Sequence, residues 1–564
     1  MARRLGSGDA VTSLSLRQGA LFGGLALFFL LFFFGPVGTV FYRGTLGASV
    51  PGAEILDQVL EILRSRQVRS VISFTVGQAS LSAALAVIVA LPGAYLVSHY
   101  TFPGRRIVYS LSLIPFVLPS IIVVVAMIGF YGKNGVINRV LGTDHNLVYN
   151  FSGIILAHVY YNLSLAIRTI STAWAGIDRR FRESAESLGD SPTGVFFRVT
   201  LPLLLPAILT SFILVFIYCF LSFGVVLVFG GIRYATFEVA IYREMFINLD
   251  ITAAAVFAFL QILFSGVFVV ISSRSIGWAR AGALDTEKEL PRLSQAPILR
   301  RIALSAYIGA ILVFVLGPLT TMVFSAFTGG DGALGFENFR QLLNPGAADR
   351  NVESILRSSI GGVILRSLLL AGASGTITFL VATASALSLR GENRAWLDGA
   401  LQIPVAISLV TVGLGLRLMW HTVVPELLLI VIGQFFVAFP LVFRIIRSGV
   451  EELSDPVVHA AEILGARRWR ILRDIELPLL RRTFLNGYAY ALALPFADLT
   501  IVMAIGRGRI TTFPVVIYRL IGFRSFDLAL ALSVLYVAVC LVLFWMIDST
   551  SLSTGVQSQE SQNE

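Results

Sequence analysis

Apolar stretches of about twenty or more residues recur along the whole chain, separated by polar segments that hold most of the arginines. A helix needs roughly 20 residues to cross about 30 Å of hydrocarbon, because each residue advances it by about 1.5 Å. The first stretch, Ala20 to Tyr42, is too long for the apolar region of a cleaved signal peptide, and no small-residue cleavage site follows it. The pattern predicts an all-α, polytopic membrane protein.

The remaining candidate spans fall into two sets. The first set continues with residues 71–97, 107–130, 147–167, 203–229 and 251–272. The second set comprises residues 302–327, 362–389, 397–420, 423–443, 485–505 and 528–547. About twelve transmembrane helices result, and an even number places both termini on one side of the membrane.

The arginines predict which side that is. With the N terminus in the cytoplasm, the internal segments contain Arg105, Arg106, Arg179, Arg180, Arg182, the linker from Arg274 to Arg301, Arg467, Arg468, Arg470, Arg473, Arg481 and Arg482. This agrees with the positive-inside rule and predicts a multi-pass protein of a prokaryotic inner membrane with both termini cytoplasmic. The net charge of +10 is then explained by topology and by the anionic cytoplasmic leaflet, so nucleic acid is not an expected partner.

The second set of spans repeats the first. A shift of 276 residues places 236–243 (TFEVAIYR) on 512–519 (TFPVVIYR), with six of eight positions identical. The same shift aligns Arg168 with Arg444 and Gly230 with Gly506. Periodic hydrophobicity alone does not place arginine, glycine, proline and tyrosine in register, so the halves are homologous.

Each half holds about six spans, so both halves enter the membrane in the same orientation as a parallel repeat. The expected domains are residues 1–70 (tail, first span and external loop), 71–273 (first core), 274–301 (cytoplasmic linker), 302–361 (seventh span and external loop), 362–548 (second core) and 549–564 (polar tail).

A cytoplasmic segment between the fourth and fifth spans of each half carries the strongest functional signal. The first copy has Glu183, Ser184, Ala185, Gly189, Leu201 and Pro202; the second has His459, Ala460, Ala461, Gly465, Leu477 and Pro478. The residues before each glycine favour a helix, which the glycine can end in the left-handed conformation. In the first copy, Asp190 or Ser191 can cap the next helix, with Pro192 in its first turn. Leu-Pro marks the return to the membrane.

These segments resemble the EAA signature of type I ABC importer permeases, at the same spacing in both halves. We call residues 183–202 the first EAA segment and residues 459–478 the second. The resemblance implies that each docks, as a coupling helix, into one of two copies of a separate ATP-binding subunit, and that an external solute-binding protein delivers the solute. The chain departs from the signature at Ser184 and His459. An ordinary interfacial helix is the alternative for a single copy, and two copies in register argue against it.

Other residues suggest chemistry less strongly. Asp498, a carboxylate within a predicted span, aligns with Ser222, and the pair indicates a broken helix or a gate. Tyr160 and its repeat partner Phe436 are candidates for lining a passage, although helix packing is the commoner role. The lysines, Lys133 and Lys288, lie outside any P-loop pattern, so we expect no ATP hydrolysis by this chain. No metal or cofactor site is expected.

Beyond the EAA segments, most of the chain resembles fused permeases of ferric-iron and thiamine importers, with residues 131–135, 157–163, 237–242 and 513–518 closer to the thiamine group. The resemblance favours thiamine or its phosphates as the solute, and ferric iron is the alternative. A secondary transporter is the competing class, but it needs intramembrane acids for coupling, and Asp498 alone offers one.

Overall fold

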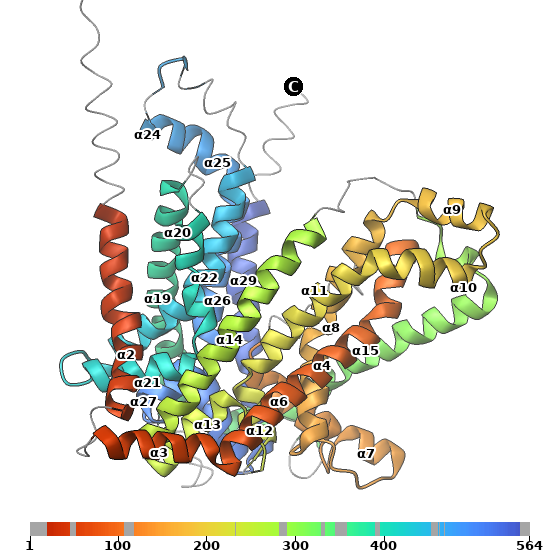
Figure 1. Ribbon diagram of the computed structural model, residues 1–564. Helices are drawn as coiled ribbons and strands as arrows, with labels where there is room; N and C mark the ends of the chain where they lie inside the picture. Colours follow the sequence, from red (N-terminus) through yellow and green to blue (C-terminus); the bar gives the residue numbers. More distant parts are fainter. Residues whose placement is uncertain are drawn as a thin grey trace, which may run out of the picture. The chain divides into compact units, whose positions relative to one another are not determined.

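The computed structural model describes residues 20–45, 52–105, 118–231, 233–280, 290–328, 333–343, 358–389, 395–452, 461, 463–466 and 468–552. The regular structure in these ranges is helical, with two isolated β-bridges (Figure 1). The chain divides into two compact units. Unit 1 comprises residues 1–49, 349–516 and 535–564, and unit 2 comprises residues 50–348 and 517–534.

The units do not follow the order of the chain. Unit 1 combines the first apolar span with most of the second half, and unit 2 combines the seventh span with most of the first half. The chain crosses from unit 1 to unit 2 within α28 (Phe513–Gly522) and returns within α29 (Phe526–Leu552). Each half has therefore exchanged its first span for that of the other half.

Unit 2 is built around three long helices that pack pairwise: α4 (Arg66–His99), α8 (Phe151–Gly176) and α11 (Leu201–Phe220). Helix α15 (Ile298–Ala326) packs against α4 and α6, and α14 (Ile251–Arg280) packs against α11. The other elements are α3 (Gly52–Arg64), α6 (Ser120–Tyr131), α7 (Val136–Leu141), α9 (Arg179–Ser187), α10 (Pro192–Val195), η2 (Phe196–Thr200), α12 (Gly224–Phe229), α13 (Phe237–Arg243), η3 (Glu244–Asn248), η4 (Leu293–Gln295) and α16 (Glu337–Leu343).

Unit 1 repeats this plan with α19 (Ile360–Ser388), α22 (Glu426–Glu452) and α26 (Arg481–Ala497), which also pack pairwise. The helix that begins at Ala20 continues through η1 (Leu30–Phe34) into α2 (Gly35–Thr45) and packs against α21 (Leu409–Trp420). The other elements are α20 (Ala395–Ala400), η5 (Ile403–Ala406), α24 (Arg468–Ile471), η6 (Leu472–Glu476), α25 (Leu477–Leu479) and α27 (Thr500–Gly506).

Aromatic rings hold the first span in unit 1. Phe29 and Phe33 each lie against Phe436 of α22, with ring centroids 5.3 and 5.0 Å apart. Gly415 permits the close approach of α21, because an added Cβ would meet the carbonyl oxygen of Pro36 at 2.3 Å. Such edge and tilted contacts between rings add to the burial of their apolar area.

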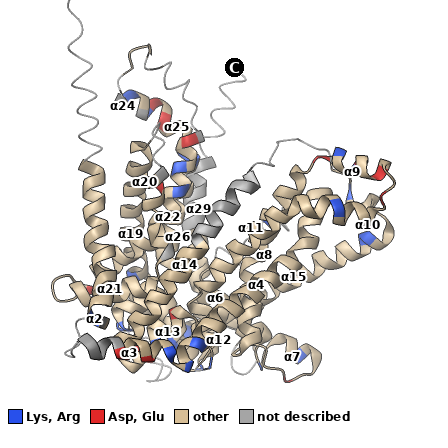
Figure 2. Ribbon diagram, in the orientation of Figure 1, with Lys and Arg blue, Asp and Glu red and all other residues tan. Residues whose placement is uncertain are grey.

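Eight helices of the described ranges are long and apolar enough to cross a membrane, and ten if two bent pairs are each one span. The other two of the twelve expected spans correspond to α8, whose polar side chains lower its hydropathy, and to the shorter apolar helix Phe526–Val542 at the start of α29. Figure 2 shows that charged residues of unit 2 gather towards the ends of its helices, around α9 and α10 at one end.

Three predicted spans are interrupted: residues 203–229, 397–420 and 485–505. The breaks in 203–229 and 485–505 agree with the broken helix indicated by Ser222 and Asp498, whereas the break in 397–420 corrects the expectation of a continuous helix. Residues 397–420 bend by 85° between Trp396–Val405 and Leu409–Trp420. Pro404 lacks an N–H to continue a helix, and the Ser408 hydroxyl caps the new one by accepting the N–H of Thr411. Residues 203–229 are interrupted between α11 and α12, at residues 221–223.

Candidate functional site

The first EAA segment is anchored at both of its ends. Trp174 and Ile177, at the end of α8, and Phe196, at the start of η2, pack on one apolar cluster with α4 and α11. The Asp178 carboxylate accepts the N–H of Arg180 at 3.0 Å and caps α9. The three-helix core of unit 2 therefore fixes where α9 begins and where the segment returns to the core.

Helix α9 turns most of its signature residues outward. Glu183 and Ser184 are exposed, whereas Ala185 is buried. Leu188, which follows the last residue of the helix, is 89% exposed. The segment therefore presents a carboxylate and an exposed apolar side chain at the end of unit 2 marked by α9 in Figure 1.

Gly189 ends α9 as the sequence predicts. Its φ is +89°, the Gly189 N–H donates to the Glu186 carbonyl at 3.0 Å, and the Asp190 N–H donates to the Ala185 carbonyl at 3.1 Å. This pair of bonds is the Schellman motif, which satisfies carbonyls that a helix end leaves open. The Ser191 hydroxyl then accepts the Gly194 N–H at 3.2 Å, with Pro192 in the first turn of α10.

The second EAA segment has the same turn. Gly465 has a φ of +79°, and the Ala466 N–H donates to the Ala461 carbonyl at 3.0 Å. Ile463 and Leu464 are 85% and 87% exposed. His459 and Ala460 lie outside the described residues.

Both segments return to their cores through a π-helical turn. Elements η2 and η6 lie 276 residues apart, each just before a Leu-Pro pair: Leu201-Pro202 and Leu477-Pro478. Pro202 has no N–H for the helical bond to the fourth residue back. The N–H of the preceding residue, Leu201, bonds five residues back to the Phe196 carbonyl, which is the π-helical pattern. The sequence marks this return, but the widened turn was not expected from it.

The repeat partners Ser222 and Asp498 each lie where a helix is interrupted. Asp498 is buried between α26 and α27, which bend by 47°, and its carboxylate accepts the N–H groups of Thr500 and Ile501 at 3.0 and 3.1 Å. Ser222 lies between α11 and α12, and its backbone carbonyl accepts the Thr236 hydroxyl at 3.1 Å. Asp498 thus caps a helix with its side chain, whereas the bond of Ser222 uses its backbone.

A buried glutamine binds next to each interruption. The Gln78 amide donates to the Cys219 carbonyl at 2.9 Å, and the Gln434 amide donates at 3.0 Å to the carbonyl of Pro495, the repeat partner of Cys219. Gln434 also lies 3.5 Å from the Asp498 carboxylate. Sequence reasoning missed both residues, although a glutamine inside an apolar span is a signal that its amide has a buried partner.

Tyr160 and Phe436 contact the exchanged spans. The Tyr160 hydroxyl donates to the Val315 carbonyl of α15 at 2.9 Å, and its ring lies 5.5 Å from that of Phe314. Phe436 packs on the first span, as described above. Both side chains are buried, and these contacts correspond to the packing role.

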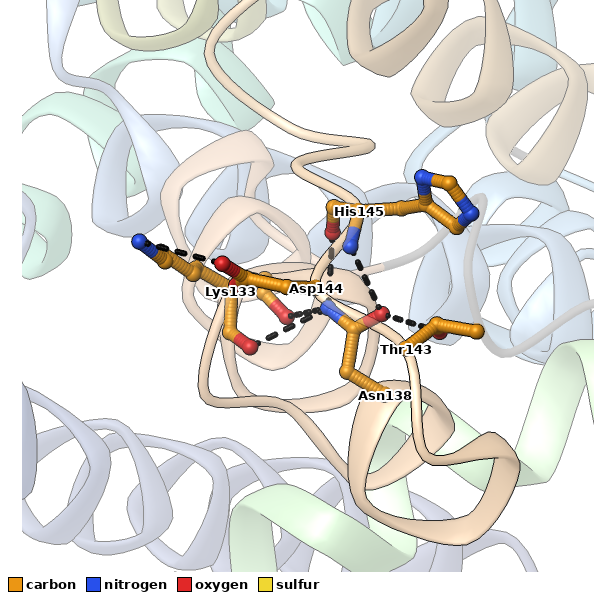
Figure 3. A network of polar contacts seen from close by, with 6 residues as sticks. Lys133, Asn138, Thr143, Asp144 and His145 are labelled. Atoms are coloured by element: carbon orange, nitrogen blue, oxygen red, sulfur yellow. Dashed lines mark hydrogen bonds and ion pairs between the residues drawn. The ribbon is translucent and has the colours of Figure 1, made fainter.

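A second structured loop lies at the other end of α8 from α9 (Figure 1). Figure 3 shows how Asn138 organises it: the amide nitrogen donates to the carbonyls of Gly132, Lys133 and His145, and the amide oxygen accepts the Thr143 hydroxyl. Lys133 and Asp144 form an exposed ion pair at 3.4 Å. The loop contains residues 131–135, noted from the sequence, and exposes Val140 and Leu141.

Comparison with known proteins adds two findings. The family described as "Binding-protein-dependent transport system inner membrane component" matches twice, over residues 82–277 and 310–550. The chain is 26% identical over 544 residues to the thiamine transport system permease protein ThiP of Haemophilus influenzae, covering 93% of this chain and 94% of that protein. It is 27% identical to ThiP of Escherichia coli, over 85% of this chain and 88% of that protein. It is 25% identical to ThiP of Brucella abortus, over 85% of this chain and 87% of that protein.

Proposed function

This chain belongs to the family of inner membrane components of binding-protein-dependent transport systems, with two copies fused in one polypeptide, and we propose that it supplies both transmembrane halves of an ATP-driven importer. It passes a small solute from an external binding protein to the cytoplasm, while two copies of a separate subunit hydrolyse ATP. The duplicated EAA turn, with Gly189 and Gly465 both at positive φ, carries this proposal. A helix end that is exposed and rigidly capped suits a partner's groove.

In this proposal, each EAA segment docks on one ATPase subunit. Leu188 and Leu464, the exposed apolar residues before the glycines, enter the groove, and Glu183 pairs with a cation there. Ser222 and Asp498, at the interrupted helices, belong to the gate. Tyr160 and Phe436 position the exchanged spans instead of lining the pathway.

The solute is thiamine or a thiamine phosphate. Support comes from the three relatives, which are named thiamine transport system permeases and whose similarity extends over most of the chain. The test is uptake into proteoliposomes that contain the permease, its ATPase subunit and the binding protein. We expect ATP-dependent accumulation of labelled thiamine. If Fe³⁺ were taken up and thiamine were not, the substrate would be ferric iron. If uptake occurred without ATP, the protein would not be an ATP-driven importer.

Both termini, the linker and both EAA segments lie in the cytoplasm in this proposal. Arginine distribution supports this orientation. A cysteine in place of Lys288, in the linker, should resist a membrane-impermeant thiol reagent added to intact cells. A cysteine in place of Lys133, in the loop of Figure 3, should react. The reverse pattern would invert the topology.

A further inference from the structure

A cavity of about 660 Å³ lies at the end of unit 2 that carries α9. Five segments meet there: the end of α4, the junction of α8 and α9, the end of η2, residues 290–295 of the linker, and the start of α15. The lining residues are Tyr95, His99, Tyr100, Trp174, Ile177, Asp178, Arg182, Thr200, Leu290, Pro291, Arg292, Gln295 and Arg300. Cavities of about 300–1,000 Å³ hold small molecules in many proteins. The solute pathway and the docking role assigned above do not require it.

The linker wall of this cavity is fixed in place. The Thr101 N–H donates to the Pro291 carbonyl at 2.9 Å, and the Leu293 N–H donates to the Thr101 carbonyl at 2.8 Å. Leu293 is also buried in an apolar cluster with Leu96 and Tyr100. A linker that only joined two halves would not need these contacts, and here it completes a concave site.

The charges around the cavity favour an anion. Arg182, Arg292 and Arg300 line it together with a single carboxylate, Asp178, which already accepts a backbone N–H. The Arg300 guanidinium donates to the Tyr100 hydroxyl at 3.4 Å, which places it beside the tyrosines of the cavity. Guanidinium groups bind phosphate oxygens through paired hydrogen bonds, which makes arginine the usual residue for phosphate recognition.

One wall of the cavity is aromatic. Tyr95 stacks on His99 with ring centroids 4.4 Å apart, and Trp174 lies 5.4 Å from Tyr95 and 5.5 Å from His99. The cluster continues to Tyr100, 6.0 Å from Tyr95. A planar ring can stack on or meet the edge of such a cluster.

The second half lacks these residues. At the 276-residue shift, Trp174 corresponds to Val450 and Arg182 to Val458, and the linker occurs once in the chain. A part needed equally by both ATPase contacts would occur twice. The cavity is therefore specific to the first half.

We propose that this cavity binds a phosphate-bearing small molecule with a planar ring, the ring against Trp174 and Tyr95 and the phosphate held by Arg182, Arg292 and Arg300. Arg182 also pairs with Glu186 of α9 at 3.3 Å. A bound phosphate competes for this arginine, changes the charge of the first EAA segment and joins α9 to the linker. Occupancy thus regulates one ATPase contact and not the other. This consequence rests on the coupling role proposed above, whereas the binding does not.

The binding test uses the full chain without its ATPase subunit, in nanodiscs of phosphatidylcholine. We expect calorimetry to detect binding of ADP and of thiamine diphosphate, about tenfold weaker binding of inorganic diphosphate, and none of adenosine. Arg182→Gln and Arg292→Gln should each weaken ADP binding about tenfold, because each removes a charge-assisted hydrogen bond. The matched control Arg180→Gln, which alters an exposed arginine of α9 outside the lining, should leave it unchanged.

A lipid headgroup carries the same phosphate chemistry, and nanodiscs of phosphatidylglycerol distinguish the two sources. A soluble occupant still binds in these discs. If the headgroup is the occupant, ADP binding disappears there, and native mass spectrometry finds phosphatidylglycerol retained by the wild type but not by Arg182→Gln. The site would be overturned if the wild type neither bound phosphate compounds nor retained the lipid. It would also be overturned if binding and retention were equal in the wild type and both arginine variants. Because ADP is the main probe, this result is independent of whether thiamine is imported.

Discussion

The two EAA segments share a backbone but not a surface. In both segments a glycine has a positive φ, and the residue after the glycine bonds back to the alanine five residues earlier. Both then lead through a π-helical turn to a Leu-Pro pair. The φ angles of Gly189 and Gly465 differ by about ten degrees, and the coupling role proposed above makes this common turn a shared mechanical requirement.

The charges, by contrast, have diverged. In the second segment, His459 stands in place of Glu183 and Val458 in place of Arg182. The first segment also has an ion pair between Asp190 and Arg198, and the equivalent residues are Ala466 and Asp474. The first segment thus has an ionic pattern that the second does not reproduce. We infer that the turn transmits motion in both halves, whereas side-chain charge makes the two contacts unequal.

The shared turn predicts the largest effect. Gly189→Val and Gly465→Val should each reduce ATP-dependent uptake about tenfold. Open space surrounds both glycines, so the cost is conformational: a left-handed residue with a Cβ costs roughly 1–2 kcal/mol, and a branched one more. Uptake by proteoliposomes is the measurement.

Two controls accompany these variants. Asparagine tolerates positive φ, so Gly189→Asn should retain more uptake than Gly189→Val. Gly309 also has open space but lies within α15 at negative φ, so Gly309→Val should have little effect. Full uptake by both EAA variants would remove the basis for the shared mechanical requirement.

The divergent charge at the start of the motif predicts the next effect. Glu183→Ala should lower ATPase coupling and complex stability more than His459→Ala, by about 2 kcal/mol or more if the carboxylate pairs with an arginine in a partly dry groove. A carboxylate is charged at neutral pH, whereas a histidine can be neutral. Both variants are compared as purified complexes at one pH and salt concentration. Equal losses would mean that the joints are equivalent.

The two interrupted helices extend the same comparison. Asp498→Ala removes a side-chain cap from α27 and should cost about 1 kcal/mol, while Asp498→Asn keeps a capping oxygen and should cost less. Ser222→Ala should cost little, because Ser222 contributes its backbone carbonyl. Thermal unfolding of the purified permease measures all three. A larger loss for Ser222→Ala would show that its hydroxyl has a role of its own.

Local signals decide how much of this could be predicted. Gly189, Ser191 and Pro192 act on their immediate neighbours, so the helix, turn and cap of the first EAA segment could be predicted from sequence. Asp498 similarly revealed an interrupted helix. Ser222 carries no comparable signal by itself, since serine is tolerated inside a membrane helix. Its alignment with Asp498 in the repeat is what indicated a broken helix or a gate there.

Contacts between distant segments could not be predicted. All the spans are apolar runs of similar length, and nothing in Ala20–Tyr42 indicates that Phe29 packs on Phe436 and not on the first core. The exchange of first spans depends on such complementarity. The cavity beside α9 likewise combines Trp174, Arg182 and Arg292, which are separated by up to 118 residues (292 − 174).

The ion pair of Asp190 with Arg198, which follows the turn at Gly189, predicts the smallest effect. Its removal changes charge but leaves the glycine turn intact. Arg198 and Asp190 lie 2.8 Å apart, but the arginine side chain is 75% exposed, so Asp190→Ala should cost no more than about 0.5 kcal/mol. Because salt screens an exposed pair, the difference from wild type should shrink as ionic strength rises. Hydrogen exchange of residues 190–200 measures it. At the equivalent position, we expect Ala466→Asp to increase exchange, since the repeat has Asp474 where the first segment has Arg198, and this increase should also diminish with salt. If Ala466→Asp instead slowed exchange of residues 466–476, the second segment would provide a cation of its own, and the two surfaces would be more alike than their sequences indicate.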